Sequence, residues 1–425
     1  MQKKDIKNRI FFLLFSILIY RIGVHIPIPG INVNQIKNHI NKNENIILNM
    51  FDAISGGALS RFSIFSLGIM PYISSSILIQ ILSITIPYFE YLKNEGNNGK
   101  LKIIQYTRFL TFLISLIQSL SISLTIHNNN INNIFESNFN FHFTVVLTLL
   151  TGAMFVMWLS EQITEYGLGN GPSIIIISGI ISGIPSVIYK IINLFNSNII
   201  SIYYIILIIF FFILMIYFIL FVECLQRKIH VNYARGKFSN KICKYNISYI
   251  PIKINISGVI PPIFASSIIL FPYTLTNWSN TIKNNNIINI IKLKFYSNKI
   301  AYFISYSLLI IFFCFFYTIL VFNTKETSKN LKKSGGFLSC VRPGNNTRDF
   351  IHKILIRLTI FGSIYVIIVC LIPEILMKIF NIPLYFGGTS ILIVVVVIKD
   401  LIAQIKTYLI SDEYNYTLKD NILKL

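Results

Sequence analysis

Charged residues are scarce in this chain. They make up 12% of its 425 residues, while hydrophobic residues make up 54% and the mean hydropathy is +0.66. Soluble domains carry about 25% charged residues. The low charge therefore excludes an ordinary soluble domain and predicts a helical protein that crosses a membrane several times.

Motifs for metal binding and catalysis are also missing. The five cysteines are an odd number without a C-x-x-C pair, and the six histidines show no H-E-x-x-H spacing, so neither a disulfide framework nor a metal centre is predicted. The sequence contains no G-x-x-x-x-G-K-[ST] loop and no G-x-S-x-G element. We therefore predict a protein that is not an enzyme and that needs no cofactor.

Long apolar runs dominate what is present. Ten of them have spanning length, near residues 8–24, 71–90, 106–126, 143–160, 172–190, 200–222, 256–275, 301–322, 354–373 and 386–408. Their middles are almost free of ionisable side chains, because Glu161, Glu165, Glu223 and the Lys399–Asp400 pair lie toward the ends. A secondary transporter for a small solute would need ionisable groups at mid-depth. The pattern instead favours a path lined by apolar side chains.

The excess of positive charge, a formal +21, is concentrated in alternate loops. Residues 223–253 and 323–353 each carry seven lysines and arginines. Basic loops usually lie on the cytoplasmic side, so the pattern predicts cytoplasmic N- and C-termini and an even number of spans. The two loops either only fix this topology or also dock an anionic partner.

One stretch, SGGALSRFSIFSLGIMPYISSS at residues 55–76, does not fit a spanning helix. It is apolar, yet it contains Gly56, Gly57, Arg61 and Pro71, and a charge at the centre of a span costs a few kcal/mol. A re-entrant selectivity loop of an ion channel is one alternative, but the stretch lacks a carbonyl or carboxylate signature for ions.

Several sequence blocks resemble the SecY family, the channel subunits of the Sec protein translocon. They are RIGVHIPIPGI (21–31), SGGALSRFSIFSLGIMPYISSSILIQ (55–80), EQITEYGLGNG (161–171), SGVIPPIFASSIILFP (257–272), FFCFFYTILVFN (312–323) and FGGTSILIVVVVIKD (386–400). The likeness extends from about residue 8 to the end. It implies an all-α membrane protein with ten transmembrane helices in two inverted five-helix halves, 1–195 and 196–425, arranged as a clamshell.

The resemblance also implies a function. The chain would be a passive protein-conducting channel that passes signal-bearing polypeptides across the membrane and releases membrane spans laterally into lipid. A short re-entrant plug helix, about residues 57–68, would close the channel from the external funnel, with Arg61 facing water. A lipid-embedded scaffold, the remaining alternative, would need neither a plug nor an apolar ring.

Functional residues follow from the resemblance position by position. The pore ring would comprise Ile69, Ile73, Pro172, Ile176, Ile263 and Ile393, and the plug Gly57, Leu59, Arg61, Phe62, Ile64 and Phe65. The lateral gate would include Gln80, Asn170 and Asn255. The docking site would include Arg227, Lys228, Arg235, Lys332, Lys333 and Arg342. Pro172 departs from the isoleucine that is usual in the ring, and Cys224–Leu225 departs from a common Arg-Gly.

The expected partners are also those of the family. They are SecE and SecG in a heterotrimeric channel, the motor ATPase SecA, the ribosome, signal-bearing preproteins and membrane lipid. The expected location is the bacterial plasma (inner) membrane rather than an organellar membrane of bacterial ancestry.

Overall fold

The computed structural model describes residues 2–29, 52, 55–128, 138–197, 201–233, 248–279, 299–338, 341–379 and 387–422. Each of the ten predicted apolar runs falls on a helix or helix pair. These are α1 (Gln2–His25), α4 (Met70–Thr85) with α5 (Pro87–Asn94), α6 (Asn97–Asn128), α7 (Asn138–Tyr166), α8 (Gly171–Asn196), α9 (Ile202–Cys224), α10 (Ile260–Ser279), α12 (Lys299–Val321), α14 (Asn345–Ile379) and α15 (Gly388–Ile422).

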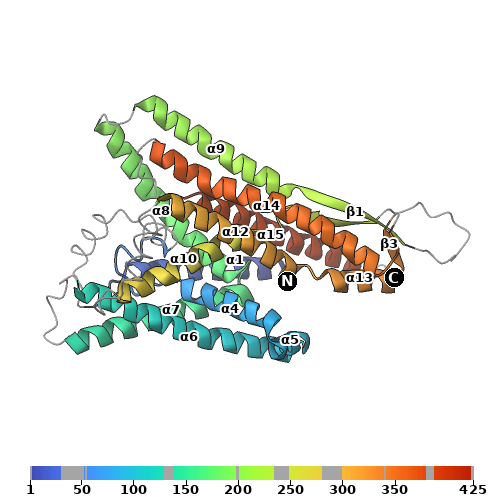
Figure 1. The fold of residues 1–425 in the computed structure, drawn as a ribbon, viewed down its shortest axis with the longest axis horizontal. Coiled ribbons are helices and arrows are strands. Elements are labelled where there is room, and N and C mark those ends of the chain that lie inside the picture. Colours follow the sequence, from blue (N-terminus) through green and yellow to red (C-terminus); the bar gives the residue numbers. More distant parts are fainter. Residues whose placement is uncertain are drawn as a thin grey trace, which may run out of the picture.

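By length and composition, eight of the described helices can cross a membrane singly, and the α4–α5 pair is a bent ninth candidate. The described apolar part of α10, Ile260–Ile269, is shorter. Seen together, the helices form a wedge in which α6 and α7 lie along one side and α9 and α14 along the other (Figure 1).

The predicted span 71–90 was wrong at its end. Helix α4 stops at Thr85, and α5 turns away from it by 103°. The cause is Pro87, which has no N–H to donate and disfavours a helical residue before it; Ile86 is accordingly extended, with φ −108° and ψ 120°. Because α5 lies nearly perpendicular to α4, the run 71–90 is a bent helix pair and not one straight helix.

Two contact regions join helices α1–α8 to helices α9–α15. Along one, α10 packs against α4 and α6; along the other, α15 packs against α8 and α1. One hydrophobic core runs through both regions, with fully buried members such as Val24, Ile163, Ile310 and Leu392. The two groups of helices therefore close on each other around a common apolar interior.

The two basic loops form a small sheet that the sequence analysis did not predict. Strand β1 (Gln226–Tyr233) pairs antiparallel with β2 (Ser248–Lys253) and with β3 (Gly336–Leu338), in the order β2-β1-β3. Helix α13 (Thr324–Lys333) covers it, and its first turn is capped by Asn323, whose side chain accepts from two backbone N–H groups. An apolar cluster that includes Ile229, Leu331 and Leu355 packs the sheet, α13 and α14 together.

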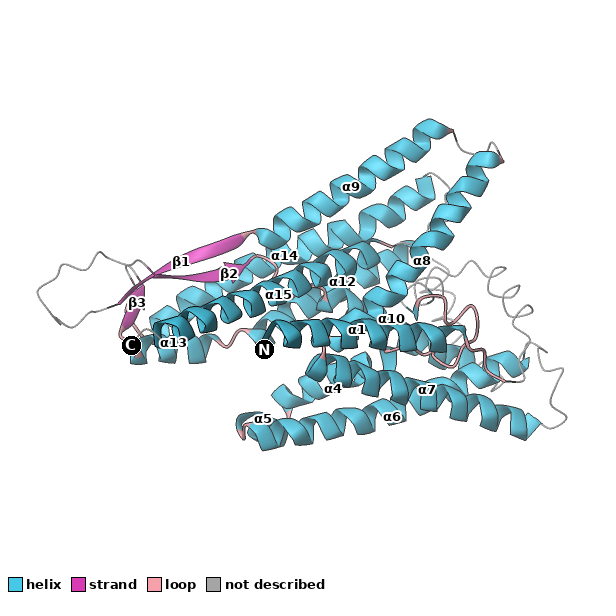
Figure 2. Ribbon diagram, turned by 180° about the vertical axis from the view of Figure 1, so that it is seen from behind, coloured by secondary structure: helices cyan, strands magenta, loops and turns pink. Residues whose placement is uncertain are grey.

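Both chain ends lie toward this end of the bundle (Figure 2).

Candidate channel seal, gate and docking surface

Residues 55–69, which contain the predicted plug and are called the plug segment below, form a series of turns instead of the regular helix expected at 57–68. The backbone explains this difference, because Gly56, Gly57, Phe62 and Gly68 all have positive φ, between 51° and 82°, and an α-helix needs φ near −63° at every residue. The segment folds back on the end of α1. The Ile28 N–H donates to the Phe62 carbonyl, and the Ile64 N–H donates to the Ile26 carbonyl, each at 3.0 Å.

Aromatic packing holds the plug segment against α1 and α7. The Phe65 ring stacks between Tyr20 and Phe155, with centroid distances of 5.9 and 5.7 Å. Phe62 is buried in a second cluster with Phe141 and Leu149 of α7. The segment is thus sheltered by protein, where irregular backbone at membrane depth is tolerated.

Two glycines that the sequence analysis did not single out make this packing possible. A Cβ atom on Gly23 would lie 2.0 Å from the Phe65 ring, and a Cβ atom on Gly152 would lie 2.1 Å from the Ile64 carbonyl oxygen. No side chain fits at either distance. The only sequence signal for them is a small residue within an apolar helix, which is common in spanning helices.

Five of the six predicted ring residues lie in the central core. Ile69 precedes α4, Ile73 lies on it, and Ile176, Ile263 and Ile393 belong to α8, α10 and α15; all five are at most 8% exposed and share one apolar cluster. Pro172 is outside this cluster, half-buried in the first turn of α8. Its missing N–H is unpaired at a helix start in any case. Pro71 occupies the first turn of α4, as predicted.

The three predicted gate residues have different surroundings. Gln80 is half-buried on α4, and Asn170 is exposed just before α8. Asn255 is buried, and its Nδ2 donates to Glu223 Oε1 at 2.6 Å and to the Gly258 carbonyl at 3.2 Å. Asn255 therefore fixes the turn that leads into α10, and it anchors that turn to the end of α9.

Glu223 is the centre of a buried polar network that the sequence analysis missed. Its carboxylate lies 3.6 Å from Lys399 Nζ of α15, which also donates to the Glu223 carbonyl. Sequence placed both residues near span ends but gave no signal that the two ends meet. Removing the charge of Lys399 would leave the buried Glu223 carboxylate without a counter-ion, whereas Lys399 itself is only half-buried.

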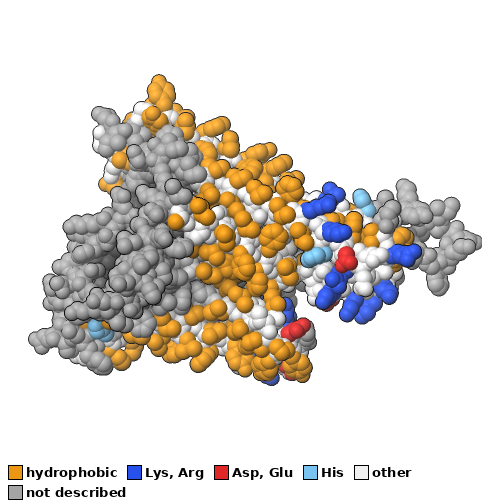
Figure 3. Space-filling view, in the orientation of Figure 1, with side chains coloured by type: hydrophobic (Ala, Val, Ile, Leu, Met, Phe, Trp, Pro, Cys, Tyr) orange, Lys and Arg blue, Asp and Glu red, His pale blue; other side chains and the backbone are white. Residues whose placement is uncertain are grey.

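The basic side chains gather at the end of the bundle that carries the sheet (Figure 3). Arg227, Lys228, Lys332, Lys333 and Arg342 are exposed there, whereas Arg235 lies outside the described residues. Lys228 Nζ also lies 4.8 Å from the centre of the Tyr249 ring. The fold thus joins two loops that are about a hundred residues apart in sequence into one positive surface.

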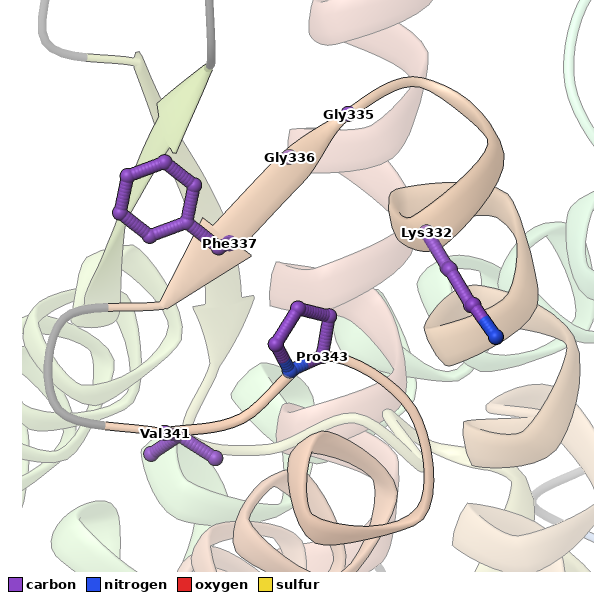
Figure 4. A pocket seen from close by; sticks show the side chains of 6 residues that line it. All are labelled: Lys332, Gly335, Gly336, Phe337, Val341 and Pro343. Carbon is purple, nitrogen blue, oxygen red and sulfur yellow. The ribbon is translucent and has the colours of Figure 1, made fainter.

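A shallow cavity of about 360 Å³ opens in this surface, lined by Lys332, Gly335, Gly336, Phe337, Val341 and Pro343 (Figure 4). Phe337 and Pro343 supply apolar walls, and Lys332 supplies a positive charge at the rim. Arg342 follows Val341 directly and is exposed, while its carbonyl accepts from the Thr347 hydroxyl at 2.9 Å. The cavity offers an apolar contact beside the positive charges.

A wedge of apolar helices around a buried apolar core, with a basic surface at one end, defines a helical protein suited to cross a membrane several times. Comparison with known proteins gives the family. The SecY family model matches residues 63–402, and the chain belongs to the SecY family. It is 47% identical to the protein translocase subunit SecY of Buchnera aphidicola subsp. Schizaphis graminum over 98% of this chain and 95% of that one. It is 44% identical to that of Escherichia coli K12 over 99% and 95%.

Solved structures agree on the fold. The structure of a protein-conducting channel aligns with a TM-score of 0.66 at 17% identity and covers 96% of this chain and 93% of that one. Sec61 in the canine ribosome-channel complex from the endoplasmic reticulum aligns with a TM-score of 0.63 at 18% identity, with the same coverage. The ten-helix arrangement expected from the sequence is consistent with these structures.

Proposed function

We propose that this chain is the central protein-conducting channel of the Sec translocase and that its described conformation is the closed one. The observation that carries the proposal is the apolar seal. Isoleucines from α4, α8, α10 and α15, together with Ile69, are buried in one cluster, and the plug segment packs against it through Phe65. The relatives at 44–47% identity are named protein translocase subunits.

The chemistry of the seal fits a channel for polypeptides. Branched apolar side chains exclude water and ions, and hydrophobic constrictions gate by dewetting. They form no specific bonds with a passing chain, so the sequence of that chain does not matter to them. Pro172 would leave one side of the ring without a branched side chain. Energy comes from a partner, because the channel residues supply only a path.

The contact of α10 with α4 and α6 serves as the lateral gate. It is mainly apolar, and the polar contact that crosses it between described residues is weak, from the Ser267 hydroxyl to Met70 Sδ at 3.8 Å. A weakly bonded contact between helices suits a gate that must open. Each polar bond between helices in a membrane contributes only about 0.6–2 kcal/mol. Gln80 on α4 belongs to this gate, and Asn255 positions α10. Asn170 precedes α8, which packs against α15 in the other contact region.

The basic surface docks the partners that drive translocation, which are SecA and the ribosome. It lies on the cytoplasmic side of the bacterial plasma membrane, with both termini on the same side, as the distribution of lysine and arginine predicts. SecE and SecG complete the channel. Docking to a ribosome is supported by the likeness to Sec61, which was solved in a ribosome-channel complex.

Photocrosslinking tests the channel. A stalled, signal-bearing chain is presented to the complex with probes at Ile73, Ile176, Ile263 and Ile393, and with a control probe at Ile206, which is 60% exposed on α9. We expect crosslinks from the four ring positions, none from Ile206, and loss of all of them when the signal is inactive. An absence of ring crosslinks while SecA or the ribosome is bound would refute the proposal.

Salt dependence tests the docking surface. Each lysine or arginine that contacts phosphate releases a counter-ion, so Arg342→Ala should lower ribosome affinity and also reduce the slope of log affinity against log salt by about 1. Phe337→Ala should lower affinity without changing that slope, because it removes only apolar contact. Equal slopes in wild type and Arg342→Ala would contradict a phosphate contact at Arg342.

A further inference from the structure

We propose that His25 is a positioning residue for the plug segment: neutral His25 holds Arg61 and keeps the channel closed, and protonated His25 releases it. The proposal rests on the plug role given above. His25 is the last residue of α1, and the Arg61 guanidinium donates to its Nε2.

The two contacts of the His25 ring fit one tautomer, which is assigned from the chemistry of the partners. Its Nδ1 lies 2.9 Å from the Arg21 carbonyl oxygen, which only accepts, so Nδ1 carries the hydrogen. Arginine only donates, so Nε2 must present a lone pair to Arg61. The arrangement is therefore that of a neutral imidazole with its hydrogen on Nδ1. A second hydrogen on Nε2 would point at Arg61 and remove the acceptor.

Protonation would also add a charge to a positive neighbourhood. Arg21 is on the same helix face and is close enough for its guanidinium to repel that of Arg61; it is held by the Ser182 hydroxyl of α8 at 2.7 Å. A charged His25 would be the third cation in this group. Among the described residues, Asp52 is an acidic group that acts on Arg61, and its Oδ1 accepts from the Ser60 N–H at 2.8 Å. Burial raises the pKa of the Asp52 carboxyl, so Asp52 supplies less compensating charge as the pH falls.

The contact between Arg61 and His25 is next to Phe62, where the backbone of the plug segment bonds to the residues that follow α1. Arg61 precedes Phe62, whose carbonyl accepts from the Ile28 N–H, and Pro27 and Ser63 form a β-bridge. Repulsion at Arg61 therefore acts directly on the strand-like contact that keeps the segment in place. At the other end the Tyr20 hydroxyl donates to the Ser55 carbonyl at 3.2 Å, a contact that does not involve an ionisable acceptor.

Histidine changes charge between about pH 8 and pH 5. His25 is at the opposite end of α1 from the chain start, so in the proposed topology it faces the outside of the plasma membrane. The plug would then loosen when the external medium becomes acidic, while acid on the cytoplasmic side would have no effect on this contact.

Ion conductance of the purified translocase complex in planar bilayers, without a translocating chain, tests the proposal. We expect conductance to rise about tenfold when the pH on the plug side falls from 7.5 to 5. This is the effect expected when the closed state loses one charge-assisted hydrogen bond. His25→Gln keeps an acceptor near Arg61 but does not titrate, so it should remove the response. His25→Lys should conduct at both pH values. Asp52→Asn should retain a response, since the contact between His25 and Arg61 is unchanged.

Two results would overturn the proposal: no acid response in wild type, or the same response in His25→Gln. Deletion of residues 57–67 separates this failure from failure of the plug itself. If the deletion raises conductance at pH 7.5 but His25→Gln responds like wild type, only the His25 contact is refuted. If the deletion leaves conductance unchanged, the plug role is refuted and the His25 proposal with it.

Discussion

Replacing Gly152 of α7 by alanine should open the resting channel to ions. The new Cβ atom would lie 2.1 Å from the Ile64 carbonyl oxygen of the plug segment. Carbon–oxygen contacts are normally about 3.3–3.6 Å, so helix and plug must separate by more than about 1 Å. The obstacle is backbone, and no rotation of a side chain can relieve it.

The cost can be estimated from overpacking in protein cores. Such substitutions cost about 1–3 kcal/mol. A loss of about 2 kcal/mol from the closed state alone would shift the ratio of open to closed channels by about 30-fold, since 1.4 kcal/mol corresponds to tenfold. In the proposed mechanism the affected state is the closed one, because the plug segment, and Ile64 with it, would leave α7 when the channel opens.

Resting ion conductance of the purified complex in planar bilayers measures this shift. Thr151→Ala is the matched control: Thr151 is exposed on the same helix, and its hydroxyl bonds only within that helix, so conductance should not change. The midpoint of thermal unfolding shows whether the variant is folded. A folded Gly152→Ala protein with the conductance of wild type would refute the close packing of plug and α7.

Three further predictions follow from single contacts. Gly23→Ala should also raise resting conductance. Adding Phe65→Leu should bring the conductance back down, because the contact at 2.0 Å is with the Phe65 ring and not with backbone. If the double variant conducts like Gly23→Ala in the same assay, this geometry is contradicted. Lys399→Met should lower the free energy of unfolding by about 3–5 kcal/mol, because it leaves the buried Glu223 carboxylate without a counter-ion. The double variant with Glu223→Gln should recover most of that loss. Equal stability of the single and double variants in denaturant unfolding would contradict this prediction. Arg108→Gln breaks the Arg108–Glu161 ion pair and should lower the free energy of unfolding by only about 0–1 kcal/mol, because the Arg108 side chain is 49% exposed. A loss as large as that of Lys399→Met would be inconsistent with this exposure.

The sequence by itself determined the class of protein and the positions of the helices. Apolar runs of spanning length specify membrane helices almost regardless of context, because a backbone in lipid must satisfy its own hydrogen bonds. All ten runs therefore fell on helices. The error at residues 86–90 arose because one apolar run was extended past Pro87, where the helix bends. Composition also separated a channel lined by apolar groups from an ion-coupled transporter.

Only the tertiary structure decided which residues meet. Glu223 and Lys399 are 176 residues apart, and His25 and Arg61 come from a helix end and a turn; no local pattern specifies such pairs. The sheet was missed for the same reason, since β3 has three residues and exists only by pairing with β1. Gly23 and Gly152 have no side chain to give a signal. Their importance arises from the plug backbone and rings that pack against them, which is a property of packing rather than of sequence.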